Sequence, residues 1–274
     1  MIVSYSSVTY IFYPLTEEFQ FKSRAKYVVF WEKTFIFALS LKRIMKRMKE
    51  IITYLRQLQA NNNREWFNTH KDEFLKCQAR WNELVEEVIK EISVFDPVMA
   101  NLTPKDCTYR IYRDVRFSSD KSPYKCHFGA FIAKGGKKSG NSGYYFHIST
   151  GGDDCYPYCH MLAAGDYCCE PEVLKILRED IVNGEGDFDA VVNKADSTFT
   201  LEREGALKRN PKGFPADAPY SEYLRLKYFC LVSQPDDVFW EGEGLAKRIA
   251  EKFATTKPFL DYINRAIEFS REFL

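Results

Sequence analysis

The hydrophobic pattern of this chain changes its period near residue 100, and this switch limits the folds that the chain can adopt. Between residues 62 and 95, apolar and aromatic residues recur three or four positions apart, which places them on one face of a helix. They are Phe67, Phe74, Cys77, Trp81, Leu84, Val88, Ile92 and Phe95, and His70 lies on the same stripe. The stripe predicts one long helix that begins with a capping box of Asn62 and Glu65 and ends at Asp96-Pro97.

Residues 107–150 alternate with a period of two, which is the pattern of strands. One face of residues 107–118 carries Cys107, Tyr109, Ile111, Val115 and Phe117, with Arg113 as an exception, and the other carries Thr108, Arg110, Tyr112, Asp114 and Arg116. Further strands are predicted over residues 125–133 and 143–150. The flexible turn between these two predicts an antiparallel hairpin with a long loop.

The rest of the chain alternates between helical and strand patterns. Helices are predicted over residues 48–60, 170–181 and 187–195, a short helix passing into a strand over 223–233, and a helix broken near Pro258 over 244–273. We therefore expect an α+β fold, in which an antiparallel sheet packs with N-terminal and C-terminal helices. These elements are expected to form a single domain over residues 48–274.

Residues 1–47 are expected to lie outside this domain. The apolar run from Phe35 to Leu41 is far shorter than the ~20 residues of a membrane helix, and basic residues follow it, whereas a signal peptide has them first. We interpret the segment as an over-long start, with Met45 or Met48 as the initiator, or as a disordered or helical extension. The alternative is an amphipathic segment that lies on a membrane surface.

The eight cysteines are expected to be reduced thiols in a cytoplasmic protein, because the chain is long and has no signal peptide. Cys155, Cys159, His160, Cys168 and Cys169 form the densest cluster. Structural zinc sites use two separated short cysteine pairs, and an adjacent Cys-Cys pair is difficult to aim at one tetrahedral ion. We therefore predict no metal site and no cofactor.

Charge is distributed unevenly along the chain. The whole sequence carries +1 and residues 1–49 carry +6, which leaves −5 for residues 50–274. Within this acidic body, residues 109–131 and the segment 207–214 each carry +3. If the two basic segments meet in the fold, they form a site for a phosphate or carboxylate group, because guanidinium groups bind such groups in bidentate fashion.

The predicted ligand-binding residues come from these two segments and one aromatic side chain. They are Arg110, Arg113, Arg116, Lys121, Tyr124, Lys125, Lys208, Arg209, Lys212 and Trp66, with Arg113 and Arg116 as the anion clamps. Arg113 lies on an otherwise apolar face, so its charge must be paired or line a cavity. In the alternative interpretation, Arg110, Asp114 and Arg116 pair with one another and with acidic helices.

Catalytic residues are harder to select than binding residues. Asp114 and His147 are the candidates for a proton carrier, although a histidine in a strand is more often a packing residue. No Walker lysine motif, G-x-S-x-G elbow or H-E-x-x-H motif occurs, and "FWEGEGLAK" has Lys247 in place of the third glycine of a dinucleotide fingerprint. The sequence therefore leaves open whether the protein is an enzyme.

Five stretches of the chain stand out as motifs: "LQANNNREWFNTHKDEF", "YRIYRDVRFSSDKSPYKCHFGAFIA", "GYYFHIS", "LKRNPKGF" and "SEYLRLKYF". They resemble the successive motifs of the family known as domain of unknown function 2461. The resemblance covers about residues 48 to 270 and implies a bacterial or fungal protein without an established activity. It supports a start near Met45 or Met48. Where the family has a glycine-rich stretch after "GYYFHIS", this chain is rich in cysteine, which argues against a family-wide metal site there.

Our leading expectation is a protein that binds an anionic, phosphorylated small molecule in a cleft lined by arginine and lysine. The alternative is a nucleic-acid or protein interaction module that uses the same basic face without catalysis, and no membrane partner is expected. A nucleic-acid partner predicts binding that falls steeply with salt, whereas a small ligand predicts a shallower dependence. In a third interpretation, the charged residues form only a buried ion-pair network, and Arg113→Ala destabilises the fold.

Overall fold

The computed structural model describes residues 2–5, 8–11, 48–150, 160–184 and 187–273. The chain divides into two compact units, Met1–Ile44 and Met45–Leu274. In the first, β1 (Ile2–Tyr5) and β2 (Val8–Ile11) pair in antiparallel fashion. In the part of the chain that is described, no helix is both long enough and apolar enough to cross a bilayer.

The second unit begins with helices, as predicted, but the long helix is interrupted. Residues 48–60 are helical, and they are followed by α2 (Arg64–Thr69) and α3 (Lys71–Phe95), with His70 between the two. The cap of α2 is Asn63, whose side chain accepts a hydrogen bond from the Trp66 N–H at 2.9 Å, so the predicted capping box at Asn62 is wrong.

Asn62 has a different role, because its side chain bonds to the backbone of a distant residue. Its Nδ2 donates to the Tyr124 carbonyl oxygen at 2.9 Å, and its Oδ1 accepts from the Tyr124 N–H at 3.1 Å. The amide group therefore satisfies both backbone groups of Tyr124, as a neighbouring strand would. It joins the start of α2 to the segment that leads into the sheet.

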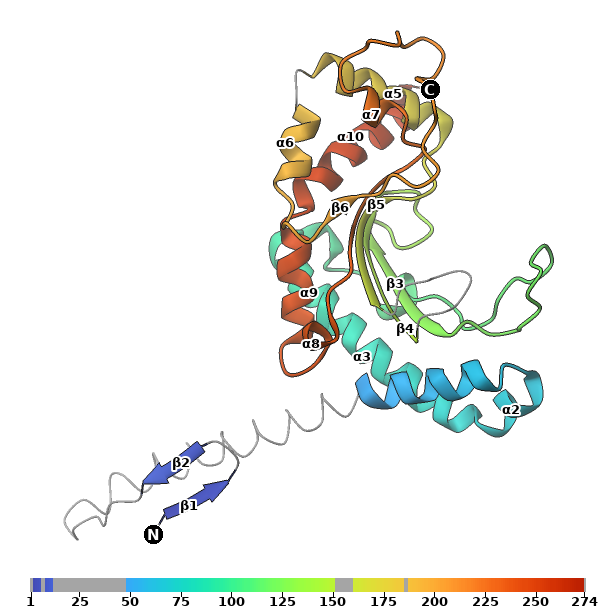
Figure 1. Ribbon diagram of the computed structural model, residues 1–274, viewed down its shortest axis with the longest axis vertical. Helices are drawn as coiled ribbons and strands as arrows, with labels where there is room; N and C mark the ends of the chain where they lie inside the picture. The colour runs from blue at the N-terminus through green and yellow to red at the C-terminus, as the bar shows by residue number, and fades with distance from the viewer. Residues whose placement is uncertain (1, 6–7, 12–47, 151–159, 185–186, 274) are drawn as a thin grey trace. The chain divides into compact units, whose positions relative to one another are not determined.

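A five-stranded antiparallel sheet forms the centre of this unit (Figure 1). Its strands are β3 (His127–Ala133), β4 (Gly143–Ser149), β5 (His160–Asp166), β6 (Thr200–Leu201) and β7 (Phe229–Ser233). Their order is β3-β4-β5-β7-β6, so β3 and β6 are the two edges. The predicted hairpin of β3 and β4 is confirmed, with Phe131 opposite Tyr145.

Residues 107–118 do not form the strand that their alternation predicts. Cys107 ends α4 (Pro104–Cys107), and single bridges join Thr108 to Ala130 and Tyr112 to Tyr124. Tyr109 and Phe117, which were expected on the buried face, are 41% and 97% exposed. The predicted core face is therefore correct only at Cys107 and Ile111.

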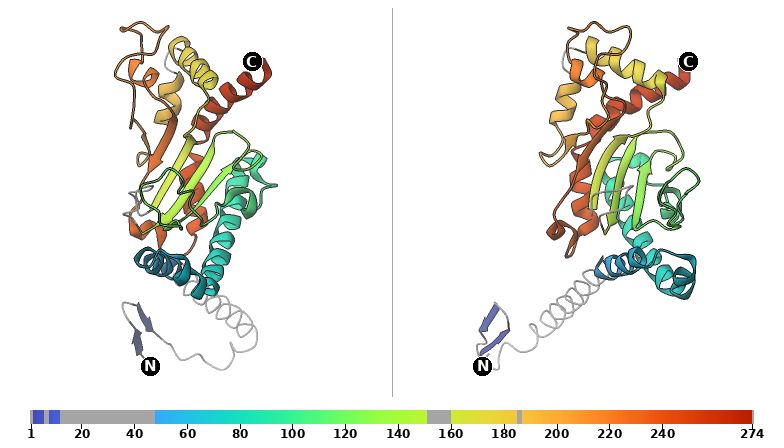
Figure 2. Two further views of the ribbon diagram at one scale, coloured as in Figure 1. Left: turned by 90° about the vertical axis from the view of Figure 1, so that its right-hand side faces the viewer. Right: turned by 45° about the vertical axis from the view of Figure 1, so that its right-hand side comes forward.

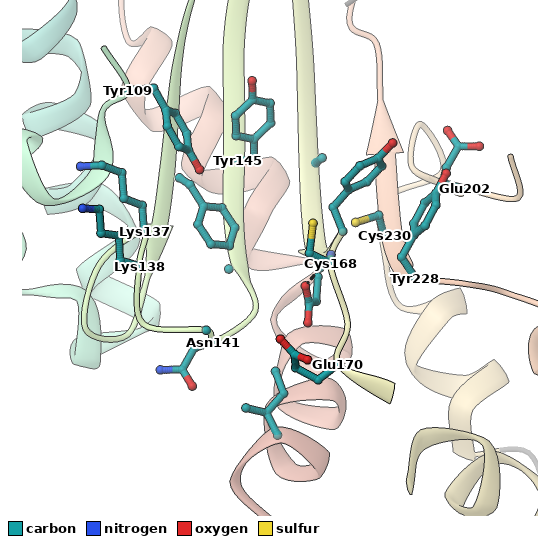
Figure 3. A pocket seen from close by; sticks show the side chains of 18 of the residues that line it. Tyr109, Lys137, Lys138, Asn141, Tyr145, Cys168, Glu170, Glu202, Tyr228 and Cys230 are labelled. Atoms are coloured by element: carbon teal, nitrogen blue, oxygen red, sulfur yellow. Dashed lines mark hydrogen bonds between the residues drawn. The ribbon is translucent and has the colours of Figure 1, made fainter. Parts of the chain in front are cut away.

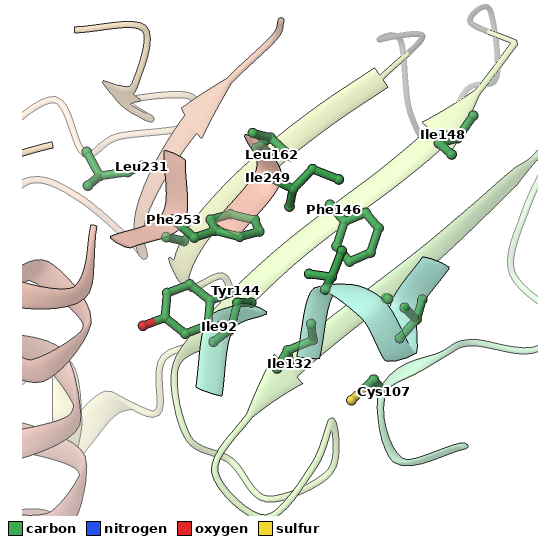
Figure 4. Close-up of a cluster of buried hydrophobic side chains, with 14 of the residues drawn as sticks. Ile92, Cys107, Ile132, Tyr144, Phe146, Ile148, Leu162, Leu231, Ile249 and Phe253 are labelled. Atoms are coloured by element: carbon green, nitrogen blue, oxygen red, sulfur yellow. The ribbon is translucent and has the colours of Figure 1, made fainter. Parts of the chain in front are cut away.

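One face of the sheet is the core of the domain. Figure 4 shows Ile92 of α3 and Phe253 of α9 (Leu245–Ala254) against Tyr144 and Phe146 of β4. Tyr144 is fully buried, and its hydroxyl donates to the Asp96 carboxylate at 2.9 Å. Burial, followed by the neighbouring Asp96, raises the pKa of this phenol far above its usual value, so it stays a donor. Helices α3 and α9 thus cover this face, and the opposite face, which carries Tyr145 and His147, is called the open face.

The remaining helices are η2 (Pro97–Met99), α5 (Pro171–Asn183), α6 (Asp187–Asn193), α7 (Ser221–Leu224), α8 (Asp237–Trp240) and α10 (Lys257–Phe273). Of these, α5, α6, α7 and α10 confirm the downstream predictions, whereas η2 and α8 were not predicted. Figure 2 shows α5, α6 and α7 beside α10, at the end of the unit opposite to α2. Helix and antiparallel sheet are thus segregated, and the domain is α+β.

An ion pair between the segment after α6 and helix α9 makes the stability of this fold sensitive to acid. Asp196 accepts hydrogen bonds from Lys252 Nζ at 2.6 Å and from the Thr198 N–H at 2.9 Å. The bond from Lys252 is the main reason why the pKa of Asp196 falls to about 2 from 3.8. Because the folded-state pKa is depressed, the contribution to stability is complete above about pH 4 and is lost as the pH falls toward 2.

We expect Asp196→Asn to lower the free energy of unfolding by about 1 kcal/mol at pH 7, since solvent screens this partly exposed pair. The deficit should shrink between pH 4 and 2 in urea unfolding. The control is Asp261→Asn on α10, whose exposed pair with Lys257 should contribute less than about 0.5 kcal/mol. A deficit that is the same at pH 2.5 as at pH 7 would show that the carboxylate charge is not its origin.

Candidate functional site

A cavity of about 1070 Å³ lies over the open face of the sheet. Alternate residues of β3 and β4 point into it, among them His127, Phe131 and Tyr145. In Figure 3, Tyr109 and Lys138 lie on one side of Tyr145, and Tyr228 and Glu202 lie on the other. The cavity therefore extends across the sheet from the β3 edge toward the β6 edge.

At one point no side chain covers the floor of this cavity, because two glycines lie opposite each other on neighbouring strands. Gly143 of β4 lies opposite Gly165 of β5, and both line the cavity. A Cβ on Gly165 would overlap the Phe229 carbonyl oxygen and lie 2.8 Å from Cys230 Cα, and the φ of Gly165 is +147°. Only glycine accepts both this close approach and this φ. The backbone of the sheet is thus the floor of the cavity at this point.

A tyrosine and a histidine form a hydrogen-bonded pair on the open face. The Tyr145 hydroxyl lies 3.2 Å from His147 Nδ1, and His147 is fully buried. A Cβ on Gly129 would be 2.9 Å from the Tyr145 hydroxyl oxygen, so a larger residue there would force the tyrosine side chain to shift. The His127 ring is 5.8 Å from the His147 ring between centroids, and it also lines the cavity.

Arg113 and Lys125 reach the cavity from the same side of a short ladder. The Arg113 N–H donates to Pro123 O at 2.9 Å and the Lys125 N–H to Ile111 O at 2.8 Å, on either side of the Tyr112–Tyr124 bridge. Because side chains alternate across paired strands, Arg113 and Lys125 share one face of this ladder. Both residues line the cavity.

The sequence model of one protein family, described as "Conserved hypothetical protein (DUF2461)", matches residues 50–262. The match covers most of the chain and nearly all of the unit that contains the cavity. The chain belongs to the DUF2461 family. No curated protein and no solved structure matches it significantly.

Within this DUF2461 domain, the two basic segments do not meet. Residues 109–125 lead into β3 at one edge of the sheet, whereas Lys208 to Lys212 follow β6 at the opposite edge. Lys208, Arg209 and Lys212 are exposed, and none of them lines the cavity over the sheet. Of the two basic segments, only residues 109–125 therefore contribute to the lining of the cavity, where Lys137 and Lys138 also lie.

Arg113 and Lys125 are the predicted binding residues that line the cavity of the DUF2461 domain. The Arg113 side chain is 8% exposed and forms an ion pair with Asp120. The bonds from Ser122 and then from Arg113 hold the pKa of Asp120 well below its usual range. The Lys125 ammonium lies 5.4 Å from the centroid of the Tyr109 ring, as in a cation–π contact.

Other predicted residues form local contacts outside the cavity lining. Arg116 donates to both carboxylate oxygens of Asp114, at 2.9 Å from Nε and 2.6 Å from an η nitrogen. Lys121 Nζ donates to the Val115 carbonyl oxygen at 3.0 Å. Arg110 is exposed and also lies outside the lining.

Asp114 lines the cavity but has the wrong acidity for proton transfer near neutral pH. The hydrogen bonds from Arg116 lower the pKa of Asp114 to about 2. Such a carboxylate is ionised at pH 7 and is a weak base, whereas an efficient proton carrier has a pKa near the working pH. Of the two predicted proton carriers, His147 therefore fits better through its bond to Tyr145.

The two aromatic candidates belong to the packing of the domain. Tyr124 is 3% exposed and stacks on Phe67 with centroids 4.0 Å apart. Trp66 stacks on His70, also at 4.0 Å. The aromatic walls of the cavity are instead tyrosines and a phenylalanine that the sequence did not single out: Tyr109, Phe131, Tyr145, Tyr167 and Tyr228.

The cysteine cluster is only partly within the described residues, because Cys155 and Cys159 lie outside them. Cys168 and Cys230 line the cavity of the DUF2461 domain. Burial raises the pKa of the Cys169 and Cys230 thiols, which keeps both protonated at neutral pH. Among the described residues, no three histidine, cysteine or acidic side chains are grouped as metal ligands.

Carboxylates occupy the far side of the cavity. Glu202 and Glu204 follow β6, and Asp166 ends β5. The lining therefore combines cations and Asp114 from residues 113–125 with carboxylates from β5 and from the segment after β6. The acidic residues of segment 202–204 have no distinctive spacing in the sequence, which is why they were missed.

Proposed function

We propose that this protein binds a small organic anion, one that carries a phosphate or carboxylate group, in the cavity over the open face of the sheet. The observation that supports this function is that Arg113, Lys125 and His127, which come from one stretch of the chain, all line this cavity. Guanidinium, ammonium and imidazole N–H groups are the donors that proteins use for such anions. The anionic group would lie among these three side chains.

The rest of the cavity suits the organic part of such a ligand. Its volume of about 1070 Å³ is at the upper end of the range for small-molecule sites. Phe131 and Tyr228 offer aromatic surfaces, and the bare glycine floor offers a flat one. A mainly apolar pocket with a few convergent polar groups is typical of ligand sites.

Tyr145 and His147 supply the cavity with a pair capable of proton transfer. Tyr145 lines the cavity, and His147 Nδ1 accepts from or donates to its hydroxyl at 3.2 Å. A reaction at the bound anion would use Tyr145 as the group that touches the substrate and His147 as the group that positions it. Binding alone does not require such a step.

The test is thermal unfolding of the full chain against phosphates, nucleotides, sugar phosphates and dicarboxylates. A ligand at 100 times its dissociation constant stabilises the fold by ~2.7 kcal/mol, or roughly 5–10 °C for a domain of this size. We expect Lys125→Gln to weaken the binding of a selective ligand about tenfold by calorimetry, since one charge-assisted hydrogen bond contributes about 1.5 kcal/mol or more.

Lys208→Gln is the matched control, because it removes the same charge from an exposed position at the opposite edge of the sheet. It should leave the affinity unchanged. Equal losses in the two variants would mean that only net charge attracts the ligand. The absence of any stabilising anion in the panel would contradict the proposed function.

A further inference from the structure

The loop of residues 113–123 carries a phenylalanine almost entirely in water at its tip. Phe117 is 97% exposed, the highest value among the large hydrophobic side chains that the structure describes, while Phe273 on α10 is 62% exposed. A single exposed apolar side chain is unremarkable in itself. At Phe117, however, the ring is combined with a fixed loop and with several cations.

The loop is held in shape by its own polar contacts. Its neck is closed by the Tyr112–Tyr124 bridge, and inside it Asp120 pairs with the buried Arg113 side chain. The other oxygen of Asp120 accepts from Ser122 N at 2.8 Å and from its hydroxyl at 2.7 Å. Phe117 is therefore presented by a pre-organised loop, which reduces the entropy lost on binding.

One cation lies beside the exposed ring, and two more occur in the same segment. Arg116 lies next to it, with Cζ 5.8 Å from the ring centroid, and its guanidinium is oriented by two hydrogen bonds to Asp114. Lys121 and Arg110 are exposed in the same segment. None of these cations lines the cavity over the sheet, although Asp114 and Ser118 of the same loop do.

We propose that this tip binds single-stranded nucleic acid, with Phe117 stacked on an unpaired base and Arg116, Lys121 and Arg110 on the neighbouring phosphates. Aromatic rings bind any base by stacking, but only where the base face is accessible, which excludes the interior of a duplex. Because the rest of the domain is acidic, it disfavours an extended contact with a duplex, and the bound stretch of nucleic acid is short. A lipid surface fits less well, because even a single acyl chain gives only marginal membrane binding and one ring is smaller.

The proposal is tested by fluorescence anisotropy of labelled oligothymidylate and oligouridylate with the full chain at low salt. Three phosphate contacts predict that the logarithm of the affinity falls with the logarithm of salt with a slope of about −2. We expect Phe117→Ala to weaken binding about tenfold and Phe117→Trp to retain it, because tryptophan preserves the stacking surface. Since the side chain is exposed, both variants should melt at the temperature of the unmodified chain.

Phe273→Ala is the matched control, because it removes an exposed aromatic ring on α10 and should leave the affinity unchanged. No saturable binding to either oligonucleotide would overturn the proposal, as would equal affinity in Phe117→Ala. Equal binding to a duplex of the same length would overturn the stacking role. Vesicles of phosphatidylcholine and phosphatidylserine form a further arm, and binding to them alone, lost in Phe117→Ala, would assign the tip to a lipid surface instead.

Discussion

Replacing Gly165 by alanine should lower the free energy of unfolding by about 3–5 kcal/mol, the largest effect that we expect from a single methyl group in this domain. The new Cβ would overlap the Phe229 carbonyl oxygen and would approach Cys230 Cα to 2.8 Å. These are backbone atoms of the neighbouring β7, so no movement of a side chain can relieve the overlap. The overpacking costs about 1–3 kcal/mol. The φ of +147° adds backbone strain of about 1–3 kcal/mol.

Gly242→Ala is the matched control for Gly165→Ala. Its φ is also positive, at +81°, but nothing lies within 4 Å of the position of its Cβ. It should cost only about 1 kcal/mol, which is the penalty for a left-handed conformation alone. Thermal unfolding distinguishes the two, with an expected loss of about 6–20 °C at Gly165. Equal losses would mean that β5 and β7 do not approach closely there.

The sequence predicts the helices well because their apolar periods extend over several turns. The break near Pro258 separates α9 from α10 as expected, and the stripe from Phe74 to Phe95 is the buried face of α3. The interruption at His70 was not predicted, because His70 continues the stripe. Its ring stacks on Trp66 at the junction of α2 and α3, so the side chain keeps its place on the apolar face although the helix ends.

Strands were predicted correctly where bulky apolar residues alternate with polar ones, and they were missed where the side chains are small or the strand is short. β5 contains Ala163, Ala164 and Gly165, whose small side chains give little periodic signal. β6 has two residues, which is too short for any pattern. Residues 107–118 alternate clearly but form a loop, because Arg113 finds its partner in Asp120 only if the chain turns back on itself.

The composition of the site depends on sheet order, which one sequence does not provide. Arg113 was identified because a cation on an apolar face must be paired or line a cavity, and it does both. Lys208 was grouped with it by charge alone, although β6 and β3 are opposite edges. The pair of Tyr145 and His147 could have been noticed from their spacing of two and from Gly129, but the register of β3 and β4 was needed to align them.

Removing Asp120 should destabilise the domain more than removing its partner. In Asp120→Ala, the Arg113 guanidinium, on a side chain that is 8% exposed, loses the carboxylate that neutralises it. Breaking a buried pair in this way costs about 3–5 kcal/mol, and the 34% exposure of Asp120 reduces this to about 2–3 kcal/mol. The expected fall in melting temperature is about 5–10 °C.

Arg113→Met should cost only about 1 kcal/mol, because the apolar chain keeps its packing and the Asp120 carboxylate retains solvent and its two bonds from Ser122. The double variant should be less destabilised than the sum of the single variants by about 1 kcal/mol or more. Additive losses would mean that the two side chains do not interact. The same variants distinguish a structural role of Arg113 from a binding role. If Arg113→Met retains ligand binding, Arg113 only supports the loop, and Lys125 and His127 are the anion donors.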